Sequence, residues 1–138
     1  MYKVLVVEDE RNTAELVKEA LELEDIQVDL AYDGKEGLEK FQTEEYDLIL
    51  LDLQMPKLTG EELLKEIRKQ NPYVDIIVYT NFERFADIKK LVNMGINGYV
   101  NKGPSADLQE LVQIVKGKLE PMNEEHMIRL INSTQELG

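Results

Sequence analysis

Four short apolar runs in this sequence are each followed by residues suited to phosphoryl chemistry. Glu8 and Asp9 follow the first run, Asp52 follows the second, Thr80 the third and Lys102 the fourth. The runs occupy residues 4–7, 48–51, 76–79 and 98–101. If the runs are parallel strands of one sheet, their carboxyl ends meet at the edge where open α/β sheets bind ligands. Three carboxylates, a hydroxyl and an ammonium group would then share one cleft.

This set of side chains predicts a metal-dependent phosphoryl acceptor. Glu8, Asp9 and Asp52 carry like charges that repel at close range unless a cation lies among them. Mg²⁺ fits because it binds one or two carboxylates and keeps several waters or phosphate oxygens. Asp52 can then attack a phosphoryl group as a carboxylate nucleophile, while Lys102 and Thr80 bind the oxygens that carry its negative charge.

Each of these residues also has a simpler explanation when it is taken alone. Glu8 and Asp9 could cap a following helix, and Asp52 could begin a turn. Thr80 is β-branched and therefore common in strands, and Lys102 could be an ordinary solvated charge. The occurrence of all four features at strand ends favours one shared site.

The apolar runs alternate along the chain with segments that have the periodicity of helices, which predicts βα units and a parallel sheet. Residues 48–51 are apolar without alternation, as in a central strand covered on both faces, and residues 28–31 form a shorter strand. We expect a first helix over residues 12–23, with Ala14, Val17 and Leu21 on its apolar face, and a second after the start signal Asp33 and Glu36, with Leu38 and Phe41. A third helix follows the start signal Thr59 and Glu62, has Leu63, Leu64 and Ile67 on its apolar face, and is stopped by Asn71 and Pro72. A fourth helix has Phe85, Ile88 and Leu91 or Val92 on its apolar face and is closed by Gly95, and a fifth is opened by Pro104 and Ser105 and has the apolar residues Leu108, Leu111, Val112, Val115 and Leu119.

Length and composition predict one domain of residues 1–120 and a short tail of residues 121–138, either an amphipathic helix or a linker. The formal charge of −12 argues against direct binding of nucleic acid by this chain. The sequence has no cysteine, which is compatible with the cytoplasm. Its apolar start is too short for a signal peptide, and we expect no membrane insertion.

Four sequence motifs together resemble the receiver domain of two-component response regulators, over residues 2 to about 119. Residues 4–9 are similar to the family's first strand and acidic pair, and residues 31–34 to its A-x-D-G turn. Residues 52–60 resemble its D-x-x-M-P-x-x-x-G stretch around the phosphorylated aspartate. Residues 95–102 resemble its G-A-x-x-Y-x-x-K stretch, with Ile96 in place of the alanine.

The resemblance implies an α/β fold with three αβα layers, doubly wound around a five-stranded parallel sheet in the flavodoxin-like order 2-1-3-4-5. It also implies the roles of the site residues: Asp52 as phosphoacceptor; Asp9, Asp52 and the backbone carbonyl of Gln54 as ligands of Mg²⁺, for which Mn²⁺ can substitute, with Glu8 acting through water; Thr80, Asn81 and Lys102 at the phosphoryl group; and Thr80 and Tyr99 as the switch.

The implied function is a signalling switch and not an enzyme with a separate substrate. A sensor histidine kinase or a phosphotransfer protein would supply the phosphoryl group. Phosphorylation would change binding to a downstream protein or output domain, or drive formation of a homodimer.

The sequence departs from the family pattern around two of the site residues. Lys102 is followed by Gly103, and proline comes only at position 104, so the usual cis peptide bond after the lysine is not expected. Asn81 stands where the family has a small residue. Gln54 and Phe82 resemble modulators of phosphoryl lifetime, and Phe82 is bulky enough to hinder a hydrolytic water.

Three other functions compete with the receiver. A haloacid-dehalogenase-like phosphatase or phosphotransferase also uses an aspartate nucleophile, but it has a D-x-D pair after the first strand, where this chain has Glu8-Asp9-Glu10. A flavodoxin-like cofactor binder needs a phosphate loop rich in Ser, Thr or Gly at that place. A receiver that has lost phosphorylation is disfavoured by the intact set of five site residues.

Overall fold

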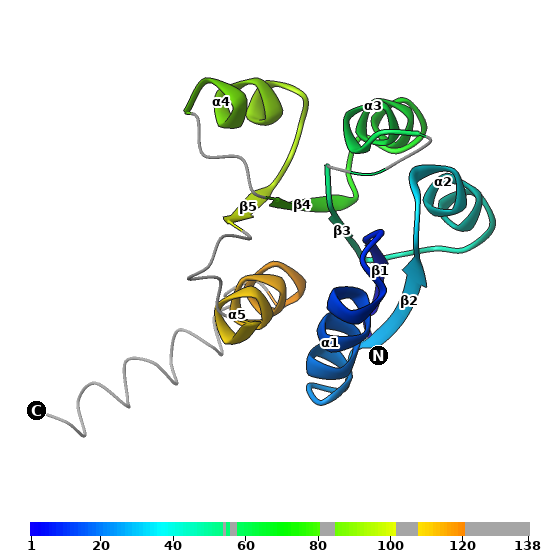
Figure 1. Ribbon diagram of the computed structural model, residues 1–138, viewed down its shortest axis with the longest axis vertical. Helices are drawn as coiled ribbons and strands as arrows, with labels where there is room; N and C mark the ends of the chain where they lie inside the picture. Colours follow the sequence, from blue (N-terminus) through cyan, green and yellow to red (C-terminus); the bar gives the residue numbers. More distant parts are fainter. Residues whose placement is uncertain (54, 56–57, 81–84, 102–107, 121–138) are drawn as a thin grey trace, which may run out of the picture.

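Five parallel strands alternate with five helices in the computed structural model, which describes residues 1–53, 55, 58–80, 85–101 and 108–120 (Figure 1). The strands are β1 Lys3–Val7, β2 Gln27–Ala31, β3 Leu48–Leu51, β4 Asp75–Thr80 and β5 Gly98–Asn101. The helices are α1 Arg11–Glu22, α2 Gly34–Thr43, α3 Gly60–Gln70, α4 Phe85–Asn93 and α5 Leu108–Leu119. The order across the sheet is β2-β1-β3-β4-β5, which confirms the predicted fold class.

The register brings the carboxyl ends of the strands to one edge of the sheet. Val7 at the end of β1 pairs with Leu51 at the end of β3, and Leu51 pairs in turn with Val78. At the far side of β4, Thr80 pairs with Asn101, the last residue of β5. Residues that follow these strands therefore leave the sheet along the same edge, as the sequence predicted.

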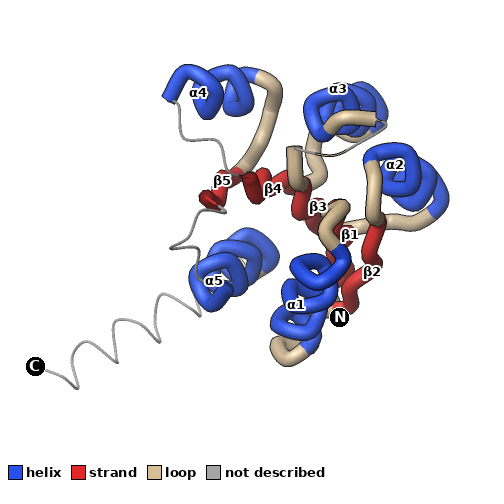
Figure 2. Tube along the Cα trace, in the orientation of Figure 1, coloured by secondary structure: helices blue, strands red, loops and turns tan. Residues whose placement is uncertain are grey.

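The helices form one layer on each face of the sheet: α1 and α5 cover one face, and α2, α3 and α4 cover the other (Figure 2). Along β1, Val4 and Val6 pack with α1 and α5, whereas Leu5 and Val7 pack on the opposite side. β3 is buried on both faces at all four of its residues. Full burial of each such side chain contributes roughly 1.5–3 kcal/mol, which explains the unbroken apolar run.

Polar side chains set the start of three helices. Asp33 caps α2 by accepting from the backbone N–H of Glu36 at 2.8 Å. Thr59 caps α3, and its hydroxyl donates to the side chain of Glu62 at 3.0 Å. The cap of α1 is Glu10, whose carboxylate accepts from the backbone of residues 12 and 13. The simpler explanation of Glu8 and Asp9 as helix caps is therefore wrong, because the helix begins one residue after Glu10.

Arg68 of α3 fixes the connection between α4 and β5. Gly95, at a φ of +99°, ends α4 in the left-handed region that favours glycine. The guanidinium of Arg68 donates to the Gly95 carbonyl oxygen from Nε at 2.9 Å and from Nη2 at 2.7 Å, and Nη2 also donates to Asn97 Oδ1 at 2.9 Å. Leu91 of α4 is buried and Val92 is exposed, which settles the alternative left open by the sequence.

Several sequence predictions fall outside the described residues and stay predictions. They concern Gln54, Asn81, Phe82, the stretch 102–107 and the tail 121–138, including the division of the chain at residue 120. Among the residues that the structure describes, none of the helices has the length and apolar character needed to span a membrane.

Candidate functional site

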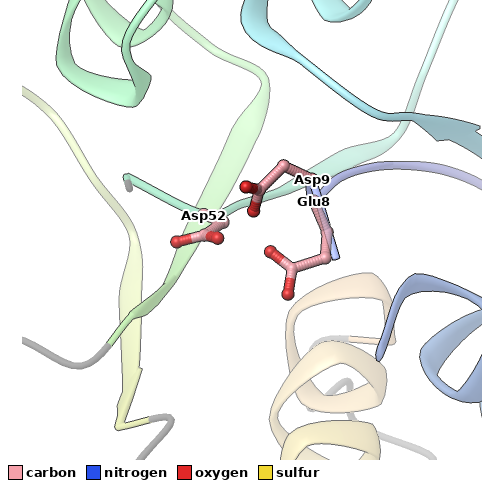
Figure 3. Close-up of side chains that lie close together, drawn as sticks. All are labelled: Glu8, Asp9 and Asp52. Atoms are coloured by element: carbon pink, nitrogen blue, oxygen red, sulfur yellow. The ribbon is translucent and has the colours of Figure 1, made fainter. Parts of the chain in front are cut away.

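Three carboxylates from two neighbouring strand ends converge at the carboxyl edge of the sheet (Figure 3). Glu8 and Asp9 follow β1, and Asp52 follows β3. One carboxylate oxygen from each residue lies within 4.8 Å of the other two. The structure thus brings together the three acidic residues that the sequence singled out.

The sheet itself fixes the backbone of this site, because its hydrogen bonds continue one residue beyond the strands. The N–H of Asp52 donates to the carbonyl oxygen of Val7 at 2.9 Å, and the N–H of Glu8 donates to that of Ala31 at 2.9 Å. Asp52 is therefore tied to β1, and Glu8 is tied to β2. The carboxylates are delivered by rigid strand ends and not by a long loop.

Burial divides the three carboxylates into two kinds. Glu8 is 2% exposed and Asp52 is 3% exposed, whereas Asp9 is open to solvent. Burying carboxylates side by side is costly unless a cation or hydrogen bonds compensate their charge. A cluster of hard oxygen donors with one member open to solvent fits Mg²⁺, which keeps part of its water shell when it binds to proteins.

The chain matches the model of the family described as response regulator receiver domain over residues 4–116. The chain belongs to that family. The receiver prediction is confirmed, and nothing in the match favours the haloacid-dehalogenase-like alternative. Receivers of this family act as phosphorylation-dependent switches in two-component signalling.

Relatives and solved structures agree with this family. The response regulator ArlR of Staphylococcus saprophyticus is 38% identical over 128 residues, which are 93% of this chain and 57% of the relative. The chain therefore spans little more than half of that protein. The Francisella response regulator 1452 receiver domain is 32% identical with a TM-score of 0.81, covering 87% of this chain and 98% of that one. Response regulator TrrA from Thermotoga maritima, solved in complex with Mg²⁺ and BeF, is 37% identical with a TM-score of 0.75. The match covers 86% of this chain and 99% of that one.

Of the other predicted site residues, Thr80 lies at the same sheet edge and Tyr99 lies within β5. Thr80 is the last residue of β4, and its backbone pairs with Asn101 of β5. Lys102 follows Asn101 directly in the chain, although its own placement lies outside the described residues. Tyr99 pairs with Val78, is partly buried and packs against the core cluster on the face covered by α2, α3 and α4.

A cation–π pair joins the start of α1 to the end of β2, next to the strand β1 that leads to Glu8 and Asp9. The guanidinium carbon of Arg11, the first residue of α1, lies 4.1 Å from the centre of the Tyr32 ring. Tyr32 follows β2, so this contact holds a positive charge near the turn that leads into α2. The sequence did not indicate this pair, because the two residues are distant in the chain and no local pattern joins them.

We expect Asp9→Asn to stabilise the metal-free receiver and to weaken its response to Mg²⁺. Removing one of three clustered negative charges relieves repulsion worth about 1–3 kcal/mol at this separation. It also removes a ligand, so the rise in melting temperature with added MgCl₂ should shrink. Thermal melts with a chelator and across a MgCl₂ titration measure both effects.

Asp47→Asn is the matched control, because Asp47 precedes β3 at the opposite edge of the sheet and accepts from the backbone of Lys3 at 2.8 Å. Its Mg²⁺ response should equal that of the wild type. An Asp9→Asn protein with an unchanged Mg²⁺ response would contradict a metal site at this cluster.

Proposed function

We propose that this chain is a phosphorylation-dependent signalling switch in which Asp52 accepts the phosphoryl group. The observation that carries the proposal is the position of Asp52: it is nearly fully buried, rigidly held and within 4.8 Å of two further carboxylates. Family membership supplies the context, because receivers are phosphorylated on an aspartate at this place in the sequence motif. The donor is a phosphohistidine of a sensor histidine kinase or a phosphotransfer protein.

The carboxylate cluster is proposed to hold Mg²⁺. Asp9, Asp52 and the backbone carbonyl of Gln54 would be its protein ligands, and Glu8 would act through a water molecule. When bound, the ion supplies the positive charge that lets an anionic phosphoryl group approach an acidic site. The complex of TrrA with Mg²⁺ and BeF supports this choice. Mn²⁺ prefers similar oxygen ligands and is proposed as a substitute.

The transfer exchanges one bond to phosphorus for another. A carboxylate oxygen of Asp52 attacks the phosphorus, the P–N bond to the donor imidazole breaks, and its electron pair stays on the imidazole nitrogen. The backbone of Asp52 is fixed by Val7, so little orientational freedom is lost on reaching the attacking position. Lys102, Thr80 and Asn81 are proposed to bind the phosphoryl oxygens.

We expect acetyl phosphate with Mg²⁺ to add one phosphoryl group to the wild-type chain and none to Asp52→Ala. Intact-mass spectrometry measures the adduct, and a chelator should abolish it. Asp47→Asn is a suitable control because it keeps every carboxylate of the site and should be labelled like the wild type. Labelling that persists in Asp52→Ala would refute Asp52 as the acceptor.

The signal is proposed to leave the site through Thr80 and Tyr99. A phosphoryl group on Asp52 would draw Thr80 at the end of β4 and turn Tyr99 inward on the neighbouring strand. β4 and β5 pair at both of these residues, which supports the passage of a movement from one strand to the other. The face that changes would include α4 and α5. The change requires only that the phosphoryl group interacts more favourably with one of two conformations of the chain than with the other.

We expect Thr80→Ala to be phosphorylated but to lose most of the conformational response. Amide chemical shifts of β5, α4 and α5 before and after phosphorylation report this response. Thr43→Ala is the matched control, since Thr43 lies at the end of α2 and its hydroxyl donates to backbone oxygens there. If Thr80→Ala shows the same shift changes as the wild type, the hydroxyl is not part of the switch.

The output of the switch is proposed to be a change in protein binding. ArlR extends well beyond the matched region, so an output domain is one candidate target of the signal. The other candidates are a separate downstream protein and a phosphorylation-dependent homodimer. The charge of −12 disfavours direct binding to nucleic acid by this chain. The phosphoryl group of a histidine kinase comes from ATP, so we place the exchange in the cytoplasm.

A further inference from the structure

The first residue of α2, Gly34, lies in direct contact with the loop that carries Asp52. A Cβ atom added to Gly34 would lie 2.0 Å from the carbonyl oxygen of Leu58 and 2.8 Å from its carbonyl carbon. Gly34 does not have a positive φ, so lack of space is what requires glycine here. The crowding atoms are backbone atoms, and no change of side-chain rotamer can remove them.

Gly60, two residues after Leu58, is packed in turn against Asp52 and Leu53. The N–H of Gly60 donates to the carbonyl oxygen of Leu53 at 3.4 Å. A Cβ atom added to Gly60 would lie 2.4 Å from Leu53 Cα and 2.6 Å from the carbonyl oxygen of Asp52. An uninterrupted series of backbone contacts therefore runs from α2 through residues 58–60 to the phosphoacceptor.

The α2 helix also rests against the strand that leads to the other two carboxylates. A Cβ atom added to Gly37 would lie 3.1 Å from a methyl group of Val7 and 3.2 Å from one of Leu63. Val7 is the last residue of β1 and directly precedes Glu8. One helix thus contacts both chain segments that deliver the carboxylate cluster, and its own start is fixed by the Asp33 cap.

We propose that Gly34 is a positioning residue for phosphoryl transfer. Because it has no side chain, residues 58–60 can pack against α2 in the position that keeps Asp52 next to Asp9. The inference rests on the proposed role of Asp52. A side chain at position 34 pushes the Leu58 carbonyl away from α2, and the packed backbone at Gly60 passes this displacement to Asp52. Gly34 does not touch the reacting atoms and acts only through this loop.

The test is Gly34→Ala, with Mg²⁺ affinity and phosphorylation rate as readouts. Isothermal titration with MgCl₂, well below the melting temperature, should show affinity weakened by about fivefold or more. The rate of Asp52 labelling by acetyl phosphate should fall by about tenfold or more, because a displacement near 1 Å can cost far more than that in a transfer reaction. Adding Leu58→Ala to Gly34→Ala should not restore either value, since the obstructing carbonyl oxygen remains.

Two control variants separate positioning from general loss of stability. Gly117→Ala adds the same methyl group on α5, where no atom from another part of the described chain lies within 4 Å of the added Cβ, and both readouts should match the wild type. Val17→Ala removes buried volume from α1 on the opposite face of the sheet. It should lower the melting temperature without weakening the binding of Mg²⁺.

A folded Gly34→Ala protein with Mg²⁺ affinity and labelling rate within about twofold of the wild type overturns the inference. If Gly34→Ala does not fold, Leu58→Ala in the wild-type background decides. It removes the packing of the Leu58 side chain against the core and so tests whether the position of this loop controls Asp52. Mg²⁺ affinity and labelling within the same limits in that variant also overturn it. An unlabelled wild-type chain would refute the proposed function itself, whereas a labelled wild type with a normal Gly34→Ala variant refutes only the positioning role.

Discussion

Repulsion among Glu8, Asp9 and Asp52 is the constraint on which the architecture of the site depends. Three carboxylate oxygens within 4.8 Å of one another would separate if their backbones were free to move. The fold prevents this by extending sheet hydrogen bonds past the ends of β1 and β3 and by burying Glu8 and Asp52. The apolar strands beneath supply the stability that offsets this local cost. The resulting cluster of hard oxygen donors favours a divalent cation and, through it, an anionic donor.

The parallel topology connects this local constraint to signalling. The strand order places β1 and β3 at the centre of the sheet and β4 and β5 beside them. The acceptor carboxylates and Thr80 therefore lie at strand ends along one edge, and Tyr99 lies on the adjacent strand β5. On the far side of α4, the guanidinium of Arg68 anchors the turn at Gly95 to α3. This anchor fixes the C-terminal end of α4, while the helix begins five residues after Thr80 in the sequence.

Features that depend on local periodicity were predicted from the sequence, and features that depend on long-range packing were not. The unbroken apolar run of β3 and the cap at Thr59 were evident because neighbouring residues determine them. The choice of Glu10 as the cap of α1 was missed because three consecutive acidic residues offer the same signal. The contacts of Arg68 with Gly95 and of Gly34 with Leu58 join distant segments, so no sequence window contains both partners. The clustering of the acidic residues was predicted only because parallel strands share an edge.

A structure of the chain with Mg²⁺ and beryllofluoride, a mimic of the phosphoryl group, tests the central claim most directly. The account predicts one Mg²⁺ bound by Asp9 and Asp52, and beryllium bonded to a carboxylate oxygen of Asp52. The backbone hydrogen bonds that link Asp52 to Val7 and Glu8 to Ala31 should persist, because they continue the hydrogen-bonding pattern of the parallel sheet. Beryllium on any other side chain, or a metal bound away from this cluster, would contradict it.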